Sequence, residues 1–269
     1  MFSKKDFQTW AKADVVPFAA VMTKIDGRPH DDLLRTYGFR GFPSLAVLNA
    51  EGEAIAKGFG RDLYTMKNVV KWAPLYSKLE AEHEAGEKVN GKEWLMARLG
   101  MGKIEADEAR TEIASLDLSG KPKQDAEQSL FVMEMTALSR QARRRDAGPD
   151  FHMEACTKVY DAFKAGRRLP QGAAPEGFFD DMLVEAAMSH KDHKAFQFAY
   201  KRVQESLQAQ IKTMESRLPR YRSDLEKFKD NEQLLPRIHA AIERAETQIA
   251  DAKKKLADMA AFAAKHRGS

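Results

Sequence analysis

The sequence lacks the features that mark several classes of protein. Cys156 is the only cysteine in 269 residues, so the chain cannot form an internal disulfide. Its apolar runs are far shorter than the roughly 20 residues that cross a bilayer, so we expect no membrane span. The 44 basic and 40 acidic residues are interspersed and leave a net charge of only +4, which does not favour nucleic acid as a partner.

The start of the chain as given carries no export signal, because no basic segment leads into an apolar stretch and a small-residue cleavage site. The location expected by default is the cytoplasm. A true N-terminus upstream of Met1 would make the periplasm the alternative.

The histidines are too scattered to predict a metal site. His190 and His193 are three residues apart, but no cysteine or cluster of carboxylates near them in sequence supplies further ligands. We expect ordinary surface or capping histidines, no metal and no cofactor. Cys156 lies among apolar positions of a predicted helix, which favours a buried core residue over a reactive thiol. The other histidines are His30, His83, His152, His239 and His266.

Turn chemistry and strand patterning agree most closely between residues 37 and 58. Residues 44–48 predict a short strand, 49–52 a hairpin turn and 53–58 a strand that pairs back on the first. Pro43 cannot donate to a strand ladder, and a cis Phe42-Pro43 bond in a tight turn is one explanation for its place before the strand.

The flanking segments extend this pattern. Residues 4–13 predict a helix, 15–25 a strand rich in β-branched residues and 31–37 a short helix. After the hairpin, Asp62 can cap a further helix that should end near Pro74. The expected order is helix, strand, helix, strand, strand, helix.

This order, with the Gly-Phe-Pro-Ser step at residues 41–44 and the later Gly58-Phe-Gly60, resembles the C-terminal half of a thioredoxin domain. The resemblance covers about residues 1–80 and is closest to bacterial thioredoxin-like proteins in which that domain precedes a long helical tail. It implies thiol–disulfide exchange on protein substrates. It also implies that the cis-proline loop contacts a substrate backbone, which makes Gly41, Phe42, Pro43 and Ser44 candidate contact residues. A purely structural role of Pro43 in the turn is the alternative.

The dithiol of that family has no counterpart here, because no cysteine precedes Cys156. Exchange needs one thiolate to attack a disulfide and a second thiol to resolve the mixed disulfide, so we expect no catalytic residue in this chain. Two explanations stay open: the intact gene begins upstream of Met1 and encodes a redox enzyme, or the domain is a non-catalytic relic. If the chain folds alone, the strand near residues 18–25 should pair directly with residues 44–48.

From about residue 75 the composition shifts to helix-forming residues. In the last third, apolar residues recur at spacings of three and four from Phe196 to Leu218 and from Leu235 to Met259, which indicates a heptad seam. We expect an antiparallel hairpin of two long helices, with Pro219 kinking or interrupting the first. The seam could close on its own chain or on a partner. Shorter helices are expected at 93–99, 104–116, 125–145, 150–165 and 178–188, with a loop at 166–177.

The sequence thus predicts an α+β fold: a small, incomplete thioredoxin-like α/β domain (residues 1–80), an all-α helical domain (81–190) and a long helical hairpin (191–269). The first function hypothesis is a thioredoxin-like protein that contacts a protein or peptide and is redox-inactive in this chain. The alternative is a non-catalytic helical adaptor or scaffold that binds a protein partner through its tail. The oligomeric state is left open.

Overall fold

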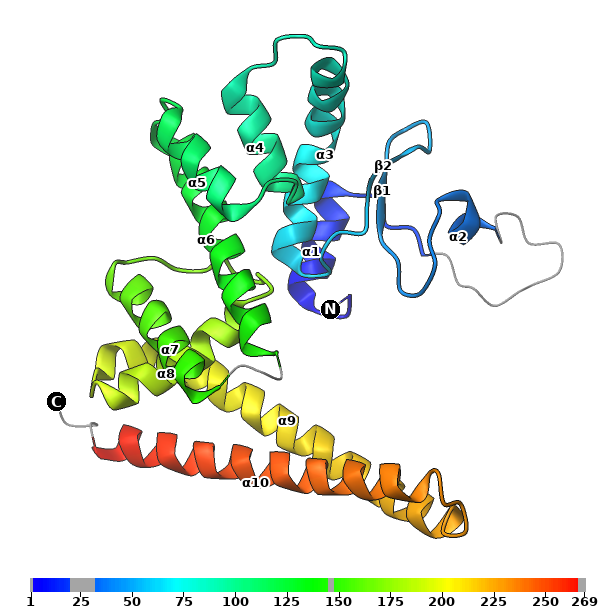
Figure 1. The fold of residues 1–269 in the computed structure, drawn as a ribbon, viewed down its shortest axis with the longest axis vertical. Coiled ribbons are helices and arrows are strands. Elements are labelled where there is room, and N and C mark those ends of the chain that lie inside the picture. The colour runs from blue at the N-terminus through cyan, green and yellow to red at the C-terminus, as the bar shows by residue number, and fades with distance from the viewer. Residues whose placement is uncertain (1, 20–31, 145–147, 266–269) are drawn as a thin grey trace. The chain divides into compact units, whose positions relative to one another are not determined.

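The computed structural model describes residues 2–19, 32–144 and 148–265 (Figure 1). Of these residues 71% are helical, and the strands among them form one two-stranded antiparallel sheet. The protein is therefore mostly helical with a small α+β element. None of the helices in the described part of the chain is long and apolar enough to cross a bilayer, as expected.

The chain divides into two compact units. Residues 1–141 and 169–176 form the first, here called the N-terminal unit. Residues 142–168 and 177–269 form the second, the C-terminal unit. The three-part division expected from the sequence stays a prediction.

The sheet of the N-terminal unit is the hairpin that the turn chemistry predicts. Strand β1 (Ala46–Leu48) pairs antiparallel with β2 (Ala54–Lys57), with an irregularity in the register after Val47. The turn is fixed by Asn49, whose side-chain oxygen accepts a hydrogen bond of 2.8 Å from the backbone N–H of Glu53. A local polar side chain thus sets the register, as Asn commonly does in turns.

The segment before the hairpin matches the expectation only in part. Helix α1 (Lys5–Asp14) confirms the first predicted helix, and α2 (Leu33–Thr36) is the core of the second. Residues 15–19, the start of the predicted strand, are not in a strand. Residues 20–25, and with them the predicted pairing of that strand with residues 44–48, lie outside the described residues.

Helix α3 (Leu63–Glu84) begins where the sequence predicts but does not end there. Asp62 caps it, since its side chain accepts a 2.9 Å hydrogen bond from the N–H of Thr65. The predicted end near Pro74 is wrong, because the helix continues for ten residues beyond it. Buried side chains lie on both sides of this proline, and their packing outweighs the loss of one backbone hydrogen bond.

The remaining helices of the N-terminal unit pack beside α3. Helix α4 (Gly91–Met101) lies along it, with the backbone of Gly100 directly against the ring of Trp72. A buried cluster then joins α4 to α5 (Ala106–Ser115) and α6 (Gly120–Ala142). The three helices confirm those predicted here, with ends shifted by a few residues.

The described residues of the C-terminal unit form four helices. Two of moderate length, α7 (Pro149–Lys164) and α8 (Glu176–Ser189), precede two long ones, α9 (His193–Lys227) and α10 (Leu235–Lys265). The long helices lie side by side as an antiparallel hairpin, which confirms the prediction (Figure 1). Helix α9 runs through Pro219, so the chain is not interrupted there, and a kink at this proline stays a prediction.

The apolar seam of the hairpin is buried within the chain. The buried seam positions are three, four and eight residues apart on α9 and seven residues apart on α10, where buried Ala263 follows the last of them by four residues. Near the end of the seam the ring of Phe196 lies 4.7 Å from that of Phe262. Because of this packing, the seam closes on its own chain. The buried seam residues are Phe196, Ala199, Val203, Ile211, Ala245, Ala252 and Met259.

Asp192 joins α7 to the start of α9. Its side chain caps α9 by accepting a 3.0 Å hydrogen bond from the N–H of Ala195. It also accepts hydrogen bonds from the Tyr160 hydroxyl (2.9 Å) and the Lys164 ammonium (3.0 Å). The backbone bond first, and then these two donors, lower the pKa of Asp192 to about 2 despite partial burial. The carboxylate is therefore ionised wherever the protein is folded near neutral pH.

Candidate functional site

The four candidate contact residues form an exposed loop directly before β1. The Phe42-Pro43 peptide is cis. The carbonyl of Pro43 accepts a 2.8 Å hydrogen bond from Arg61, and the Ser44 hydroxyl donates to the carbonyl of Gly41 at 2.5 Å. The Phe42 side chain is 64% exposed. The side chains of Arg61 and Ser44 thus hold the loop through its carbonyl groups, while the side chain of Phe42 faces solvent.

Strand β1 has one edge that β2 does not occupy. The carbonyl of Leu45 and the N–H of Asn49 both bond toward the returning strand. Backbone groups alternate sides along a strand, so Ala46 and Leu48 direct their N–H and C=O groups away from β2. Within the described ranges no other strand pairs with that edge.

Most of the exposed large apolar side chains lie in the part of the sequence that ends with β1. Five of the seven large apolar side chains that the described structure leaves exposed lie in the first 48 residues, although these make up less than a fifth of the chain. From residue 33 to residue 50 the only charged residues are Arg35 and Arg40, both basic. The exposed apolar side chains next to the open edge in sequence are thus Phe42 and Leu48, and of the two arginines Arg35 pairs with Asp32 at 3.7 Å. The five side chains are Phe2, Val16, Phe18, Phe42 and Leu48.

A shallow cavity of about 480 Å³ lies between α4 and α5. Arg98 crosses it and pairs with Glu108 at 2.6 Å and with both oxygens of Glu112. Trp94 packs beside it, with its ring stacked 5.4 Å from the ring of His83. Because two carboxylates already bind the guanidinium, the cluster links the helices and offers no group poised for acid–base chemistry.

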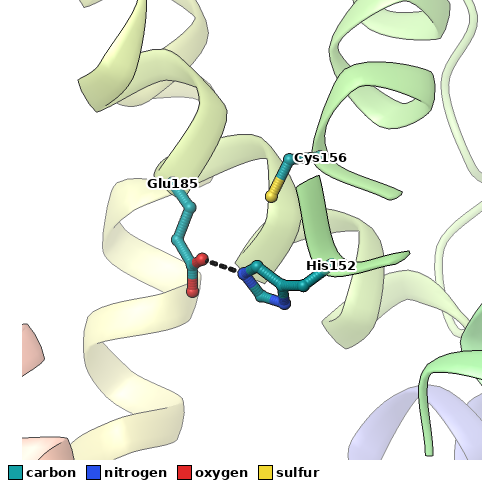
Figure 2. Close-up of side chains that lie close together, drawn as sticks. All are labelled: His152, Cys156 and Glu185. Atoms are coloured by element: carbon teal, nitrogen blue, oxygen red, sulfur yellow. Dashed lines mark hydrogen bonds and ion pairs between the residues drawn. The ribbon is translucent and has the colours of Figure 1, made fainter. Parts of the chain in front are cut away.

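A second cluster joins α7 and α8 in the C-terminal unit. Figure 2 shows His152, Cys156 and Glu185 converging from these two helices. One possible ligand atom of each lies within 4.8 Å of the others. The His152 ring nitrogen Nε2 is 2.5 Å from a Glu185 carboxylate oxygen, and the Cys156 sulfur is 3.8 Å from that of Met182.

The sequence did not predict this cluster. The one signal it offers is the spacing of four between His152 and Cys156, which places both on one helix face. The pair singled out for a possible metal, His190 and His193, does not join a ligand group in the described part of the chain. Instead, His190 stacks on Tyr160, with ring centroids 4.5 Å apart.

Lys255 from α10 completes the surroundings of the cluster. Its ammonium lies 2.7 Å from Asp181 and 2.5 Å from Glu185. Burial alone would raise the pKa of Glu185, but the bonds from Lys255 and His152 outweigh it and lower that pKa. Burial would likewise lower the pKa of Lys255, and its two carboxylate partners raise it instead. The charges of Asp181, Glu185 and Lys255 are therefore held in place by their ion pairs.

Burial raises the pKa of the Cys156 thiol to about 11, and the nearby Glu185 carboxylate adds to the effect. The thiol is therefore protonated at neutral pH. A catalytic or redox cysteine requires the opposite shift, toward the thiolate.

We expect Cys156 to react with iodoacetamide about tenfold more slowly in the folded chain than in urea at neutral pH. A pKa of about 11 in place of the ordinary 9.0 lowers the thiolate population about 100-fold, and the higher nucleophilicity of a more basic thiolate recovers about tenfold. Alkylation rates measured across the alkaline range should inflect near pH 11 in the folded protein. An inflection at or below 9 would contradict the raised pKa of this half-buried thiol.

No protein-family model, curated protein or solved structure matches this chain. The thioredoxin resemblance of residues 1–80 accordingly stays a hypothesis that rests on the residues quoted for it.

Proposed function

We propose that this chain is a thioredoxin-like protein without redox catalysis, whose N-terminal unit binds an extended segment of a partner protein. The observation that carries the proposal is the unoccupied edge of β1, directly after a loop that exposes Phe42. The hairpin, the preceding loop and the following helix α3 occur in the order that the resemblance implies.

The proposed mode of binding is strand addition. The outward N–H and C=O groups of Ala46 and Leu48 are the backbone groups that an incoming strand would pair with. Such pairing supplies affinity through the main chain, while side-chain contacts on either side supply specificity. Exposed Phe42 and Leu48 would contact alternate side chains of the bound segment.

The chemistry of the partner follows from the side chains around the edge. Apolar residues at alternate positions would cover Phe42 and Leu48. An acidic residue would pair with Arg40, since residues 33–50 carry no acidic side chain to neutralise it. The proposed partner is thus an extended segment that alternates apolar residues and contains at least one carboxylate.

Two other roles receive less support from the structure. Thiol–disulfide exchange needs two thiols, and the single cysteine lies in the C-terminal unit with a raised pKa. Binding through the tail would use the apolar seam of α9 and α10, whose half near Phe196 and Met259 is already buried against itself. The N-terminal unit is therefore the better candidate for partner binding.

Selection of random peptides displayed on phage, with the full chain as the immobilised target, tests the proposal. We expect the enriched peptides to alternate apolar residues and to contain an acidic residue. Phe42→Ala should raise their Kd at least about tenfold, because exposed aromatic anchors commonly dominate binding. Ala46→Pro should do the same, since it removes an outward N–H that β2 does not use.

Met153→Ala is the matched control, because it removes an equally exposed apolar side chain from the C-terminal unit. It should leave the Kd of the selected peptides unchanged. In NMR spectra, bound peptide should protect the amide protons of Ala46 and Leu48 from exchange with solvent. The proposal fails if no peptide is enriched, or if the selected peptides bind both N-terminal variants as tightly as the unchanged chain.

A further inference from the structure

We propose that His152, Cys156 and Glu185 form a binding site for a transition metal ion of the zinc class. The three side chains offer an imidazole nitrogen, a thiolate sulfur and a carboxylate oxygen, with one ligand atom of each within 4.8 Å of the others. Zinc sites in proteins use these three donor types. The inference is independent of the proposed peptide binding, because all three residues belong to the C-terminal unit.

The backbone that carries the ligands is held firmly. His152 and Cys156 lie one turn apart on α7, whose neighbouring Ala155 and Val159 are fully buried. Glu185 follows the fully buried Val184 on α8. Packing of both helices therefore fixes the positions from which the three side chains extend, as a metal site requires.

Modest side-chain movement would bring the ligand atoms into place around an ion. Zinc bonds of about 2.0–2.3 Å place tetrahedral ligands roughly 3.5 Å apart. His152 Nε2 and its Glu185 oxygen, now 2.5 Å apart, would move apart, and any pair near the 4.8 Å limit would approach. The side chain of His152 is 49% exposed and that of Glu185 is 33% exposed, so both have room to change rotamer. Figure 2 shows the three side chains extending toward one another from α7 and α8.

The charges around the cluster are compatible with a divalent cation. Glu185 now shares Lys255 with Asp181, so a metal can take Glu185 while Asp181 keeps the ammonium. The four groups Cys156 (as the thiol), Glu185, Asp181 and Lys255 carry a net charge of −1. Binding a divalent ion and releasing the thiol proton to water changes that sum to zero.

The donor set also selects the class of metal. Thiolate and imidazole ligands favour zinc, cobalt, nickel and copper ions over magnesium and calcium, which prefer oxygen ligands. Three protein ligands leave a fourth tetrahedral position for a water molecule. The partly exposed His152 places that position near solvent.

Titration of the metal-free, reduced full chain with Co²⁺ tests the site. We expect one equivalent to bind with a Kd below about 10 µM and to produce a thiolate-to-cobalt charge-transfer band and tetrahedral d–d bands. Zn²⁺ should bleach these bands by displacement. In the unchanged protein, Zn²⁺ should also protect Cys156 from alkylation, a readout that depends on no variant.

Variants separate a built site from an isolated thiol that binds cobalt weakly. Cys156→Ser should abolish the charge-transfer band, and His152→Asn or Glu185→Gln should each raise the Kd at least about tenfold. His190→Asn is the matched control on the same unit, and it should leave the Kd unchanged. Circular dichroism verifies that each variant is folded.

Absence of both the cobalt bands and the zinc protection, up to about 1 mM metal, would overturn the inference. So would a charge-transfer band that persists with unchanged Kd in both His152→Asn and Glu185→Gln, because the cysteine would then bind the ion alone.

Discussion

Replacing Gly100 by alanine should destabilise the N-terminal unit by about 3 kcal/mol. The sign is the opposite of the usual one, since alanine in place of glycine inside a helix ordinarily stabilises by about 1 kcal/mol. The reason is the close approach of α4 to α3. A methyl group on Gly100 would lie 2.9 Å from the Cβ of Trp72 and closer still to its indole ring.

Tryptophan fluorescence is the measurement suited to this variant. All three tryptophans, Trp10, Trp72 and Trp94, lie in the N-terminal unit, so their emission in a urea titration reports on that unit. The urea concentration at the midpoint of unfolding should be lower for Gly100→Ala than for the unchanged chain. Gly91→Ala is the control: it changes a glycine at the start of the same helix, where an added Cβ would meet only the Leu116 side chain at 3.4 Å.

A double-mutant cycle identifies the cause. If the clash with the indole is responsible, Trp72→Leu should cost less stability in the Gly100→Ala background than in the unchanged chain. Additive effects of the two substitutions, or a stable Gly100→Ala variant, would show that the helices do not approach as closely as described.

Replacing Arg202 by leucine should destabilise the C-terminal unit by about 3 kcal/mol. Asp180 on α8 has a side chain only 5% exposed, and Arg202 on α9 binds both of its oxygens at 2.6 and 2.7 Å. Loss of the arginine leaves a buried carboxylate without its ionic partner, which is costlier than loss of the pair. The expected loss of stability lies at the lower end of the range for buried ion pairs, because the side chain of Arg202 is 45% exposed.

Hydrogen–deuterium exchange followed by mass spectrometry measures this effect locally. Peptides from α8 and from the first half of α9 should exchange faster in Arg202→Leu. The control is Arg222→Leu on the same helix, whose partner Glu246 is half exposed, and it should change stability by no more than about 0.5 kcal/mol. The double variant Asp180→Leu with Arg202→Leu should regain much of the loss, because no buried charge remains. A double variant as unstable as Arg202→Leu would contradict the electrostatic explanation.

The sequence predicted those features whose cause is local. The turn at residues 49–52 and the cap at Asp62 depend on side chains that bond to backbone a few residues away, and both occur as expected. The long hairpin could also be predicted, because apolar residues spaced three and four apart indicate an amphipathic helix from the sequence alone.

The sequence failed where distant packing decides. Pro74 was expected to end a helix, yet α3 continues through it because the turns on either side pack on other elements. Helix α9 is also uninterrupted at Pro219, although no residue beyond Ile211 on this helix is buried. A rule based only on the local geometry of proline does not include the stabilisation that tertiary packing gives to a helix.

The cluster of His152, Cys156 and Glu185 was missed for a related reason. His152 and Cys156 lie on one turn of helix, but Glu185 is 33 residues beyond His152 and reaches it only through the packing of α8 on α7. The proposed contact of residues 41–44 with a peptide stays a prediction, because the structure of the chain alone does not test peptide binding.

The decline of burial along the α9–α10 hairpin has a consequence for how this element opens. Beyond Ile211 on α9, and before Ala245 on α10, neither helix has a buried residue. Turns held by so little apolar contact separate at low free energy, whereas the end near Phe196 and Met259 is fully packed. The hairpin should therefore unzip progressively from the connection at residues 228–234, and amide exchange should record a gradient of protection rather than one cooperative step.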